Sequence, residues 1–388
     1  MSTIVIDATP LQTDHRYRGI GTYTAGVLDA LTSRRRAYPL GLLAEPHHPD
    51  DLPLLGDLLA RDGVSRVALQ RPRWRRSRLR WFFGQLGLRR AVRGTTARVF
   101  HATDPNGLAH PAGVATVVTL YDFIPLHNPV ASSRLRRLDD QAGYARYLHH
   151  VRRATRLIAI SDATKWEAVE RLRIAPERIT VTPLAVDERR FYPRAPAEVD
   201  QVVRQYQLRR PYFLYVGSSD PHKNAAALVR GFDLFSRQDD TEHSLIIAGK
   251  WPHQAIAALH SRYGHMMATG RLRLLGFVPE DALPALYNGA TAYVYPSLIE
   301  GFGLPVLEAM RCATPVLTSN TSSLPEVGGD AVLYVDPHHP EEIAAALRRI
   351  ASDATLRADL VTRGLRQAAS FTWARTADET WRVYTELL

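Results

Sequence analysis

The amino-acid sequence predicts an α/β protein with two Rossmann-like domains in series, each built on a parallel sheet. Short runs rich in Val, Ile and Leu alternate with longer helical patterns along the whole chain, the order of βαβ units. The chain has 388 residues, whereas a single core stops growing at ~250–300 residues, so two domains are expected. Hydrophobic residues make up 45% and charged residues 23%, values of a folded protein rather than a disordered one.

The predicted strands form two series, one in each half of the chain. The first series covers residues 3–6, 66–70, 98–102, 116–121, 157–161 and 179–182. The second series covers residues 212–216, 244–248, 272–275, 292–295, 315–318 and 332–335. Helical patterns lie between the strands, notably over 22–31 and 133–153. Each half therefore has the pattern of one parallel sheet.

The domain boundary is expected within residues 186–211, where the stretch 187–196 interrupts the periodicity with two prolines and charged residues. We therefore expect an N-terminal domain over 1–190 and a C-terminal domain over 205–372. Residues 373–388 carry an amphipathic pattern and are expected to form a final helix.

The positive charge of the chain is concentrated in one segment. Lysine and arginine outnumber aspartate and glutamate by 49 to 39, yet residues 71–93 alone hold nine arginines and no acid. Trp74, Trp81 and Phe82 interleave with these arginines, a composition typical of an interfacial segment. We expect the segment to dock on an anionic membrane or to bind a lipid-diphosphate acceptor. The alternative is that its aromatic side chains pack the N-terminal domain. A nucleic-acid partner is not expected, because no finger spacing or aromatic RNA-binding signature occurs.

Several protein classes are excluded by features that the sequence lacks. No apolar run approaches the ~20 residues that a membrane helix needs. The first residues meet an acid at Asp7 and include no basic n-region, so no signal peptide is expected. Cys312 is the only cysteine, which excludes an intrachain disulfide and a cysteine-based metal site. A cytoplasmic enzyme or binding protein is expected, at the inner face of the membrane if the basic segment docks there.

The strongest functional pattern follows the predicted strand 292–295. Glu300 precedes the turn Gly301-Phe302-Gly303, and a helix is expected to begin near Leu304. Glycine lets the backbone approach a ligand closely, and the N–H groups of a helix start favour an anionic or hydroxyl-rich group. Glu308 lies just over one turn inside this helix, so both carboxylates can accept hydrogen bonds from paired sugar hydroxyls. The alternative is that Glu300 caps the helix and Glu308 is a solvated charge.

This pattern, Glu300-Gly-Phe-Gly-Leu-Pro-Val-Leu-Glu308, resembles the Glu-x7-Glu signature of the retaining nucleotide-sugar glycosyltransferases of family 4. The resemblance continues in other segments along the chain, namely Gly19-Ile-Gly21-Thr-Tyr, Thr119-Leu-Tyr-Asp122, Gly217 to Asn224, Gly276-Phe277-Val278, Ala313-Thr-Pro-Val and Ser323-Leu-Pro-Glu-Val. It implies the GT-B fold, in which two Rossmann-like domains face each other across the active-site cleft and the last helix crosses back to the N-terminal domain. It also implies a donor site, made of Gly19, Gly21, Gly217, Ser218, Lys223, Phe277, Val278, Glu300, Gly301, Phe302, Gly303, Leu304 and Glu308.

A second loop, after the predicted strand 212–216, carries Lys223 at the start of a helix. An ammonium group there can lie beside a diphosphate, with the helix dipole adding to its effect. Lys165 and Lys250 are the only other lysines, against 46 arginines, so we expect Lys223 to be functional rather than a plain surface charge. Family relatives often pair this lysine with an arginine a few residues earlier, which this chain lacks. Which residue supplies a second positive charge therefore stays open, with Lys250 as a candidate.

The candidates on the acceptor side are His101, Tyr121 and Asp122. Many relatives have His-Asp at the end of the strand that here ends in Tyr121-Asp122, with the histidine near the transferred sugar. Asp122 matches the family and is expected to be catalytic, together with Lys223 and Glu300. Whether the Tyr121 phenol takes over the role of the histidine stays open. His101 either lines the acceptor cleft or is a structural histidine with satisfied hydrogen bonds.

Transfer of a sugar from a nucleotide-diphosphate sugar leaves negative charge on the departing diphosphate, which Lys223 and facing N–H groups would stabilise. The resemblance implies retention of configuration by front-face attack, in which the departing phosphate takes the proton of the acceptor hydroxyl. It places Glu300 on the donor-sugar hydroxyls and Glu308 on the ribose. No Asp-x-Asp occurs, which fits a metal-independent hexosyltransferase. No cofactor is expected besides the nucleotide sugar, which is a co-substrate.

The opening Gly19-Ile-Gly-Thr-Tyr resembles bacterial mannosyltransferases of polysaccharide assembly, so GDP-mannose is the favoured donor and a UDP-sugar its rival. The acceptor is expected to be a hydroxyl of a glycan, a lipid-linked or a small molecule. A non-catalytic GT-B-like subunit that binds a sugar nucleotide or glycan is the alternative, because Tyr121 and the missing arginine depart from the family. A sugar phosphorylase or epimerase on the same fold is a third hypothesis. A nicotinamide dehydrogenase is not expected, because no Gly-x-Gly-x-x-Gly opens the first βα unit.

Overall fold

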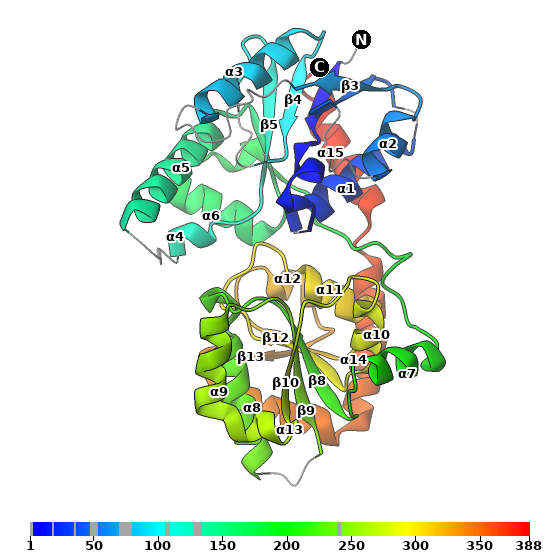
Figure 1. Ribbon diagram of the computed structural model, residues 1–388. Helices are drawn as coiled ribbons and strands as arrows, with labels where there is room; N and C mark the ends of the chain where they lie inside the picture. Colours follow the sequence, from blue (N-terminus) through cyan, green and yellow to red (C-terminus); the bar gives the residue numbers. More distant parts are fainter. Residues whose placement is uncertain are drawn as a thin grey trace. The chain divides into compact units, whose positions relative to one another are not determined.

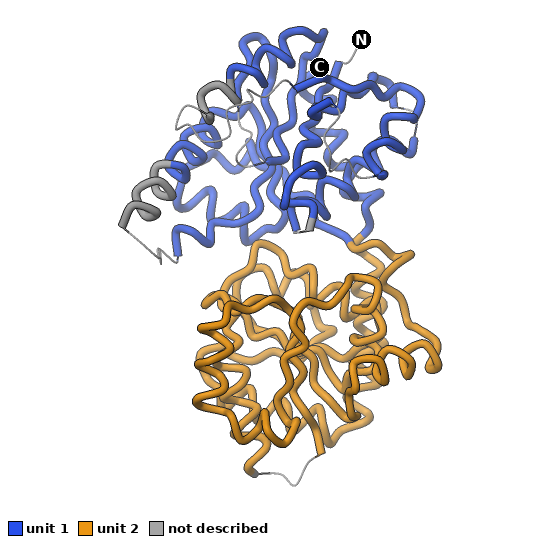
Figure 2. The backbone as a smooth tube through the Cα atoms, in the orientation of Figure 1, with its two compact units in different colours: residues 1–185, 372–388 blue, residues 186–371 orange. Residues whose placement is uncertain are grey.

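The computed structural model describes residues 3–17, 19–34, 36–46, 53–69, 80–104, 109–127, 134–238 and 242–388. The chain divides into two compact units, which Figure 2 distinguishes by colour. Unit 1 contains residues 1–185 and 372–388, and unit 2 contains residues 186–371. Each unit is a parallel sheet with helices packed against it (Figure 1), so the predicted α/β architecture of two Rossmann-like domains is confirmed.

Unit 1 is built on a parallel sheet with the strand order β3-β2-β1-β4-β5-β6-β7. Its strands are β1 Ile4–Asp7, β2 Leu40–Ala44, β3 Val64–Ala68, β4 Val99–Ala102, β5 Ala115–Leu120, β6 Arg156–Ala159 and β7 Ile179–Val181. Its helices are α1 Gly19–Thr32, α2 Pro53–Leu59, α3 Arg80–Arg93, α4 Ile124–His127, α5 Arg134–Arg153, α6 Asp162–Leu172 and α15 Trp373–Thr385, with short 3-10 turns η1 Thr9–Gln12, η2 Asp14–Tyr17 and η3 Pro176–Arg178.

Unit 2 is built on a second parallel sheet, with the strand order β10-β9-β8-β11-β12-β13. Its strands are β8 Tyr212–Val216, β9 Ser244–Ala248, β10 Leu272–Gly276, β11 Ala292–Tyr295, β12 Val316–Ser319 and β13 Leu333–Val335. Its helices are α7 Pro196–Gln205, α8 Ala225–Gln238, α9 His253–Ala268, α10 Leu283–Gly289, α11 Leu304–Arg311, α12 Leu324–Gly328, α13 Pro340–Ser352 and α14 Ala354–Ala369, with the 3-10 turn η4 Pro221–Lys223. Among the helices of the described ranges, none has the length and apolar character needed to cross a membrane.

Strand β2 is missing from the sequence-based prediction. Its sequence, Leu-Gly-Leu-Leu-Ala, has no β-branched residue, and leucine and alanine favour helices in isolation. All of its residues are buried, and it pairs with β1 on one side and β3 on the other. Pairing on both edges therefore overrides the local preference of these residues.

Helix α1 begins earlier than the sequence pattern predicts. It starts at Gly19, so Gly19 and Gly21 lie in its first turn rather than in a loop before it. The segment that follows β1 instead forms the short turns η1 and η2. Gly21 is buried against the backbone of η2. Gly19 and Gly21, which the resemblance places at the donor site, therefore lie at a helix start, whose first N–H groups have no partner inside the helix.

The last helix, α15, belongs to unit 1 although unit 2 precedes it in the sequence (Figure 2). It packs against α1, and the Thr376 hydroxyl donates a 2.5 Å hydrogen bond to the carbonyl of Pro183. Arg36 adds an ion pair with Asp378 at 3.0 Å. Val383 and Tyr384 are buried on its apolar face, which is the face that the amphipathic pattern of residues 373–388 predicts.

Candidate active site

The carboxyl ends of β8 and β11 bring Lys223 and Glu300 together in unit 2. The two strands are neighbours in the sheet; Lys223 ends the turn η4 after β8, and Glu300 lies in the loop after β11. The Lys223 Nζ atom lies 2.8 Å from Glu300 Oε1 and 2.9 Å from Oε2. The two side chains are 21% and 9% exposed, so solvent screens this ion pair less than an exposed one.

Two hydroxyl groups also hold the Glu300 carboxylate. Tyr295, the last residue of β11, donates a hydrogen bond to Glu300 Oε1 at 2.7 Å and accepts one from Lys223 Nζ at 2.7 Å. Ser297 donates to the same Oε1 atom at 2.7 Å. Burial, followed by the charge of Glu300, raises the pKa of Tyr295 well above its ordinary value, so its hydroxyl remains a donor. Tyr295 and Ser297 are not among the site residues that the sequence predicts.

The loops that carry Lys223 and Glu300 are joined to each other by hydrogen bonds of the Asn224 side chain and of the backbone. Asn224 adopts the left-handed conformation with φ 56°, and its Nδ2 donates to the carbonyls of Pro296 at 3.0 Å and Pro337 at 2.7 Å. The backbone N–H of Leu298 donates to the carbonyl of His222 at 2.7 Å. The position of the ammonium beside the carboxylate is therefore set by the loops as well as by the ion pair itself.

Helix α11 begins directly after the glycine turn, as the sequence predicts. Its N-cap is Gly303, whose φ of +114° is a conformation that other residues rarely adopt. Gly303 has no side chain with which to cap the helix, and the Glu300 carboxylate contacts Lys223, Tyr295 and Ser297 instead, so the alternative that Glu300 serves as the cap is wrong. The N–H groups of Val306 and Leu307 donate to the carbonyl of Gly303, and Pro305 has no N–H, so at this helix start the N–H of Leu304 has no acceptor inside the helix.

Glu308 lies inside α11 and accepts a 2.9 Å hydrogen bond at Oε2 from the hydroxyl of Tyr287. Burial raises the pKa of Glu308 to about 7, while the Tyr287 hydrogen bond acts in the opposite direction. The carboxyl group therefore changes its charge near neutral pH, and the alternative of a fully solvated helical charge is wrong.

A row of buried tyrosine rings lies under these two glutamates. The ring centres of Tyr287 and Tyr293 are 5.2 Å apart, and those of Tyr293 and Tyr295 are 5.7 Å apart. In the sequence, tyrosines alternate within the predicted strand 292–295. Because a buried tyrosine hydroxyl needs a hydrogen-bond partner, this alternation indicates polar contacts beside the strand. The hydroxyls of Tyr287 and Tyr295 contact Glu308 and Glu300, whereas that of Tyr293 donates to the backbone carbonyl of Val216.

The remaining donor candidates lie on loops at the same edge of this sheet. The backbone N–H of Gly217 donates to the carbonyl of Ala248 at 2.9 Å, and the Ser218 hydroxyl donates to Asp220 at 2.6 Å. Phe277, after β10, is 71% exposed, whereas Val278 is buried. An exposed aromatic ring of this size offers a stacking surface. Lys250, the candidate for a second positive charge, is exposed.

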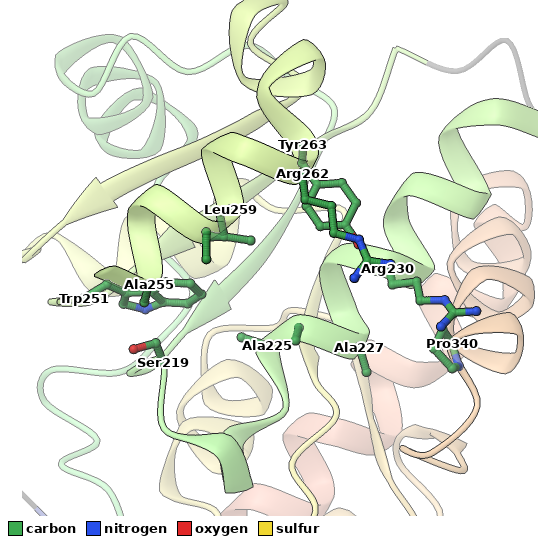
Figure 3. A pocket seen from close by; sticks show the side chains of 12 residues that line it. Ser219, Ala225, Ala227, Arg230, Trp251, Ala255, Leu259, Arg262, Tyr263 and Pro340 are labelled. Carbon is green, nitrogen blue, oxygen red and sulfur yellow. The ribbon is translucent and has the colours of Figure 1, made fainter. Parts of the chain in front are cut away.

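A pocket of about 480 Å³ borders the loop that carries Lys223 (Figure 3). It lies between α8 and α9, with Ser219 and Trp251 at one end and Arg230 and Arg262 at the other. The Trp251 indole donates a 2.9 Å hydrogen bond to the carbonyl of Gly217. The wall of the pocket therefore also supports the backbone of the loop, although Lys223 itself does not line the pocket.

In unit 1, His101 and Tyr121 are buried and hydrogen-bonded. His101 is 0% exposed; its Nδ1 lies 2.6 Å from the Tyr384 hydroxyl and its Nε2 lies 2.7 Å from the Thr119 hydroxyl. Burial lowers the pKa of His101 to about 3, so the ring is neutral. Of the two alternatives for His101, this is the arrangement of a structural histidine. The Tyr121 hydroxyl donates to the carbonyl of Thr103 at 2.8 Å.

Asp122, the other candidate in unit 1, lies directly after β5. Its Oδ1 accepts a 3.0 Å hydrogen bond from the backbone N–H of Ile124, the first residue of α4. This contact stabilises the start of that short helix. Asp122 is partly exposed, so part of its surface is open to a ligand.

The basic segment 71–93 lies only partly within the described residues. Residues 71–79, with five of its arginines and Trp74, lie outside them. In the described part, Leu88 and Val92 are buried in the core of unit 1, and Arg90 and Arg93 are exposed. The side chains of its aromatic residues lie outside the described ones, so the alternative that they pack the domain stays a prediction.

Two family models match the chain over almost all of its length. The model described as Glycosyltransferase Family 4 matches residues 17–190, and the model described as Glycosyl transferases group 1 matches residues 199–367. The first match ends at residue 190, close to residue 186, at which unit 2 begins.

Similar proteins are found among curated sequences and solved structures. The chain is 37% identical to O-antigen chain mannosyltransferase B of Escherichia coli over 59% of this chain and 60% of that protein. It is 33% identical to the serotype-specific mannosyltransferase WbdA of Escherichia coli, over 70% of this chain and 34% of that protein. The chain thus spans less than two thirds of these relatives. Anabaena HepE, solved with UDP and glucose, has the same fold, with a TM-score of 0.74 at 18% identity and full coverage of both chains.

Proposed function

We propose that this chain, which belongs to glycosyltransferase family 4, transfers a sugar from a nucleotide-diphosphate sugar to a hydroxyl group of an acceptor. The observation that carries this proposal is the contact between Lys223 and Glu300 at the carboxyl ends of β8 and β11. Ligands of parallel α/β sheets bind at this edge. A cation and a carboxylate side by side suit a donor that presents a diphosphate next to sugar hydroxyls.

The reaction needs stabilisation of the charge that develops on the departing diphosphate. Lys223 supplies a cation, and the backbone N–H of Leu304 at the start of α11 supplies a hydrogen-bond donor. Glu300 accepts hydrogen bonds from hydroxyls of the donor sugar, and Glu308 accepts them from the ribose. Transfer proceeds with retention by front-face attack, in which the departing phosphate takes the proton of the acceptor hydroxyl. No metal and no cofactor take part in this scheme.

GDP-mannose is the proposed donor, with a UDP-sugar as the rival. Two relatives at 37% and 33% identity carry the name mannosyltransferase, which supports mannose. The rival has weaker support, because HepE, solved with UDP and glucose, is only 18% identical. The proposed acceptor is a hydroxyl of a growing glycan, lipid-linked or free, since the first relative is named for the O-antigen chain.

The experiment that tests this function has two arms. Thermal-shift measurements with GDP, UDP and dTDP compare nucleotides, because a ligand that binds only the folded state raises the melting temperature. Radiolabelled GDP-mannose and UDP-sugars are then incubated with the protein, and release of nucleoside diphosphate is followed. We expect the largest shift with GDP and turnover of GDP-mannose, even as slow hydrolysis. Binding without any turnover would contradict the proposal and favour a non-catalytic sugar-nucleotide-binding subunit.

A further inference from the structure

The two carboxylate oxygens of Glu300 have different partners. Oε1 accepts hydrogen bonds from Tyr295, Ser297 and Lys223, at 2.7, 2.7 and 2.8 Å. Oε2 contacts only Lys223, at 2.9 Å, within the described part of the chain. One oxygen is therefore anchored by two neutral hydroxyls, and the other is held by the ammonium alone.

Tyr295 is the residue that joins all parts of this cluster. Its hydroxyl accepts from Lys223 and donates to Glu300, so it orients both charged groups at once. The ring is 1% exposed, lies in β11 and stacks on Tyr293, which leaves the hydroxyl little freedom to move. A hydrogen bond to a charged group contributes more to stability than one between neutral groups.

We propose that Tyr295 is a positioning residue. It keeps the Glu300 carboxylate in place while the donor diphosphate replaces Glu300 as the partner of Lys223. This inference rests on the proposed function, in which Lys223 turns to the donor diphosphate. Ser297 and Tyr295 then still anchor Oε1, and Oε2 is left to accept a hydrogen bond from a hydroxyl of the donor sugar. The Lys223–Glu300 ion pair is thus the resting contact of the site, and the anchored oxygen preserves the geometry when that contact opens.

The chain offers a matched control for this proposal. Tyr293 lies in the same strand, is 0% exposed and stacks on Tyr295, but its hydroxyl donates to the backbone carbonyl of Val216 at 3.3 Å. Tyr293→Phe and Tyr295→Phe therefore remove the same group from similar surroundings. Only Tyr295→Phe removes a hydroxyl that contacts the two charged groups.

The first readout needs no enzymatic activity. The chain has only three lysines, so acetylation by a limiting amount of an amine-reactive acetylating reagent can be followed at each of them. Peptide mass spectrometry measures the acetylation, with Lys165 as internal standard. We expect Lys223 to be acetylated about threefold faster in Tyr295→Phe than in the wild type, because its ammonium loses an acceptor and an anchored partner. Tyr293→Phe is expected to stay within twofold of the wild type. Equal acetylation of Lys223 in all three proteins would overturn the proposal.

The second readout is kinetic. We expect Tyr295→Phe to lower kcat about tenfold with GDP affinity within twofold of the wild type, and Tyr293→Phe to leave both within twofold. In a Glu300→Ala background, Tyr295→Phe should lower donor turnover by less than twofold, because the two residues act as a unit. Full additivity of the two substitutions would overturn the positioning role. If no variant, nor the wild type, turns over any nucleotide sugar, the proposed function has failed, and the acetylation rates still decide the role of Tyr295.

Discussion

The indole ring of Trp373 occupies the space in which Gly26 would otherwise carry a side chain. A β-carbon at Gly26 would lie 2.2 Å from Cε2 of Trp373, far inside contact distance. Gly26 is in α1 and Trp373 opens α15, so this contact joins the first helix of unit 1 to the last helix of the chain. A glycine in the interior of α1 costs helix stability, and the packing of α15 explains its presence.

We expect Gly26→Ala to destabilise the protein by ~1–3 kcal/mol, the usual cost of overpacking a close contact. Urea unfolding of the whole protein, followed by tryptophan fluorescence, measures this loss. Gly56→Ala is the matched control, because a β-carbon there meets no atom within 4 Å and alanine favours a helix more than glycine does. Equal stability of the two variants would contradict the close packing of α15 on α1.

We expect Lys223→Ala to cut turnover by 10²-fold or more while the fold is kept, because removal of one donor to a developing charge typically costs ~3–4 kcal/mol. Steady-state kinetics with the donor found by thermal shift measures the loss, and the melting temperature reports the fold. Lys165→Ala, in α6 of unit 1, serves as control and should retain full turnover. Near-normal turnover by a folded Lys223→Ala protein would exclude the proposed role.

We expect Glu308→Ala to weaken binding of the nucleoside diphosphate, whereas Glu300→Ala chiefly lowers the rate. The two carboxylates have separate partners, Tyr287 for Glu308 and the Lys223–Tyr295 pair for Glu300, which fits contact with different parts of the donor. Loss of the ribose contacts costs ~1–3 kcal/mol, or about 5- to 150-fold in affinity. Calorimetric titration with GDP separates the two effects, and equal weakening by both substitutions would refute the division.

We expect the affinity for GDP to rise with pH through neutrality. Burial raises the pKa of Glu308 to about 7, and the ionised carboxylate is the better acceptor for ribose hydroxyls. If only the ionised form accepts these bonds, affinity rises roughly tenfold from pH 6 to pH 8. Titrations across this range measure the rise. Glu308→Gln keeps the shape but has no titrating group, so its remaining pH dependence comes from the nucleotide.

The raised pKa of Glu308 also makes the free energy of unfolding depend on pH, and this free energy falls as the pH rises, whereas the affinity for GDP increases. A carboxyl group whose pKa is raised in the folded state contributes its full share of stability below its unfolded pKa, and that share is lost as the pH rises through about 7. Without a nucleotide, the wild type should therefore lose more stability than Glu308→Gln between pH 5 and pH 8. A parallel decline of both proteins would contradict the assignment.

We expect the basic segment 71–93 to bind anionic vesicles, with binding that falls as salt is added. Each basic residue near an anionic leaflet contributes ~1 kcal/mol, so a few engaged arginines suffice. Co-sedimentation with anionic and neutral vesicles measures this, and replacing Arg75, Arg76, Arg78 and Arg80 with serine should release the protein. If the wild type stays in the supernatant with anionic vesicles at low salt, a soluble acceptor becomes the better hypothesis.

Much of the candidate site could be predicted because its signals are local in sequence. Glu300, the glycine turn and Glu308 lie within nine consecutive residues, and Lys223 follows a strand that hydrophobic pattern alone identifies. Tyr295 and Ser297 could not be predicted in the same way. A tyrosine in an alternating buried strand has the pattern of a core residue, and the partner of its hydroxyl depends on where a loop from another part of the chain returns.

By itself, the sequence determined the two parallel sheets and the loops at which charged residues cluster, because periodicity and turn residues act over a few neighbouring positions. The tertiary structure decided what depends on residues far apart in the chain. It made a strand of Leu40–Ala44 through pairing on both edges, and it returned residues 372–388 to unit 1. It also buried His101 against Tyr384, 283 positions away, and raised the pKa of Glu308 by burial. Both effects arise from the removal of polar groups from water, which is a property of the packed molecule and not of any local pattern.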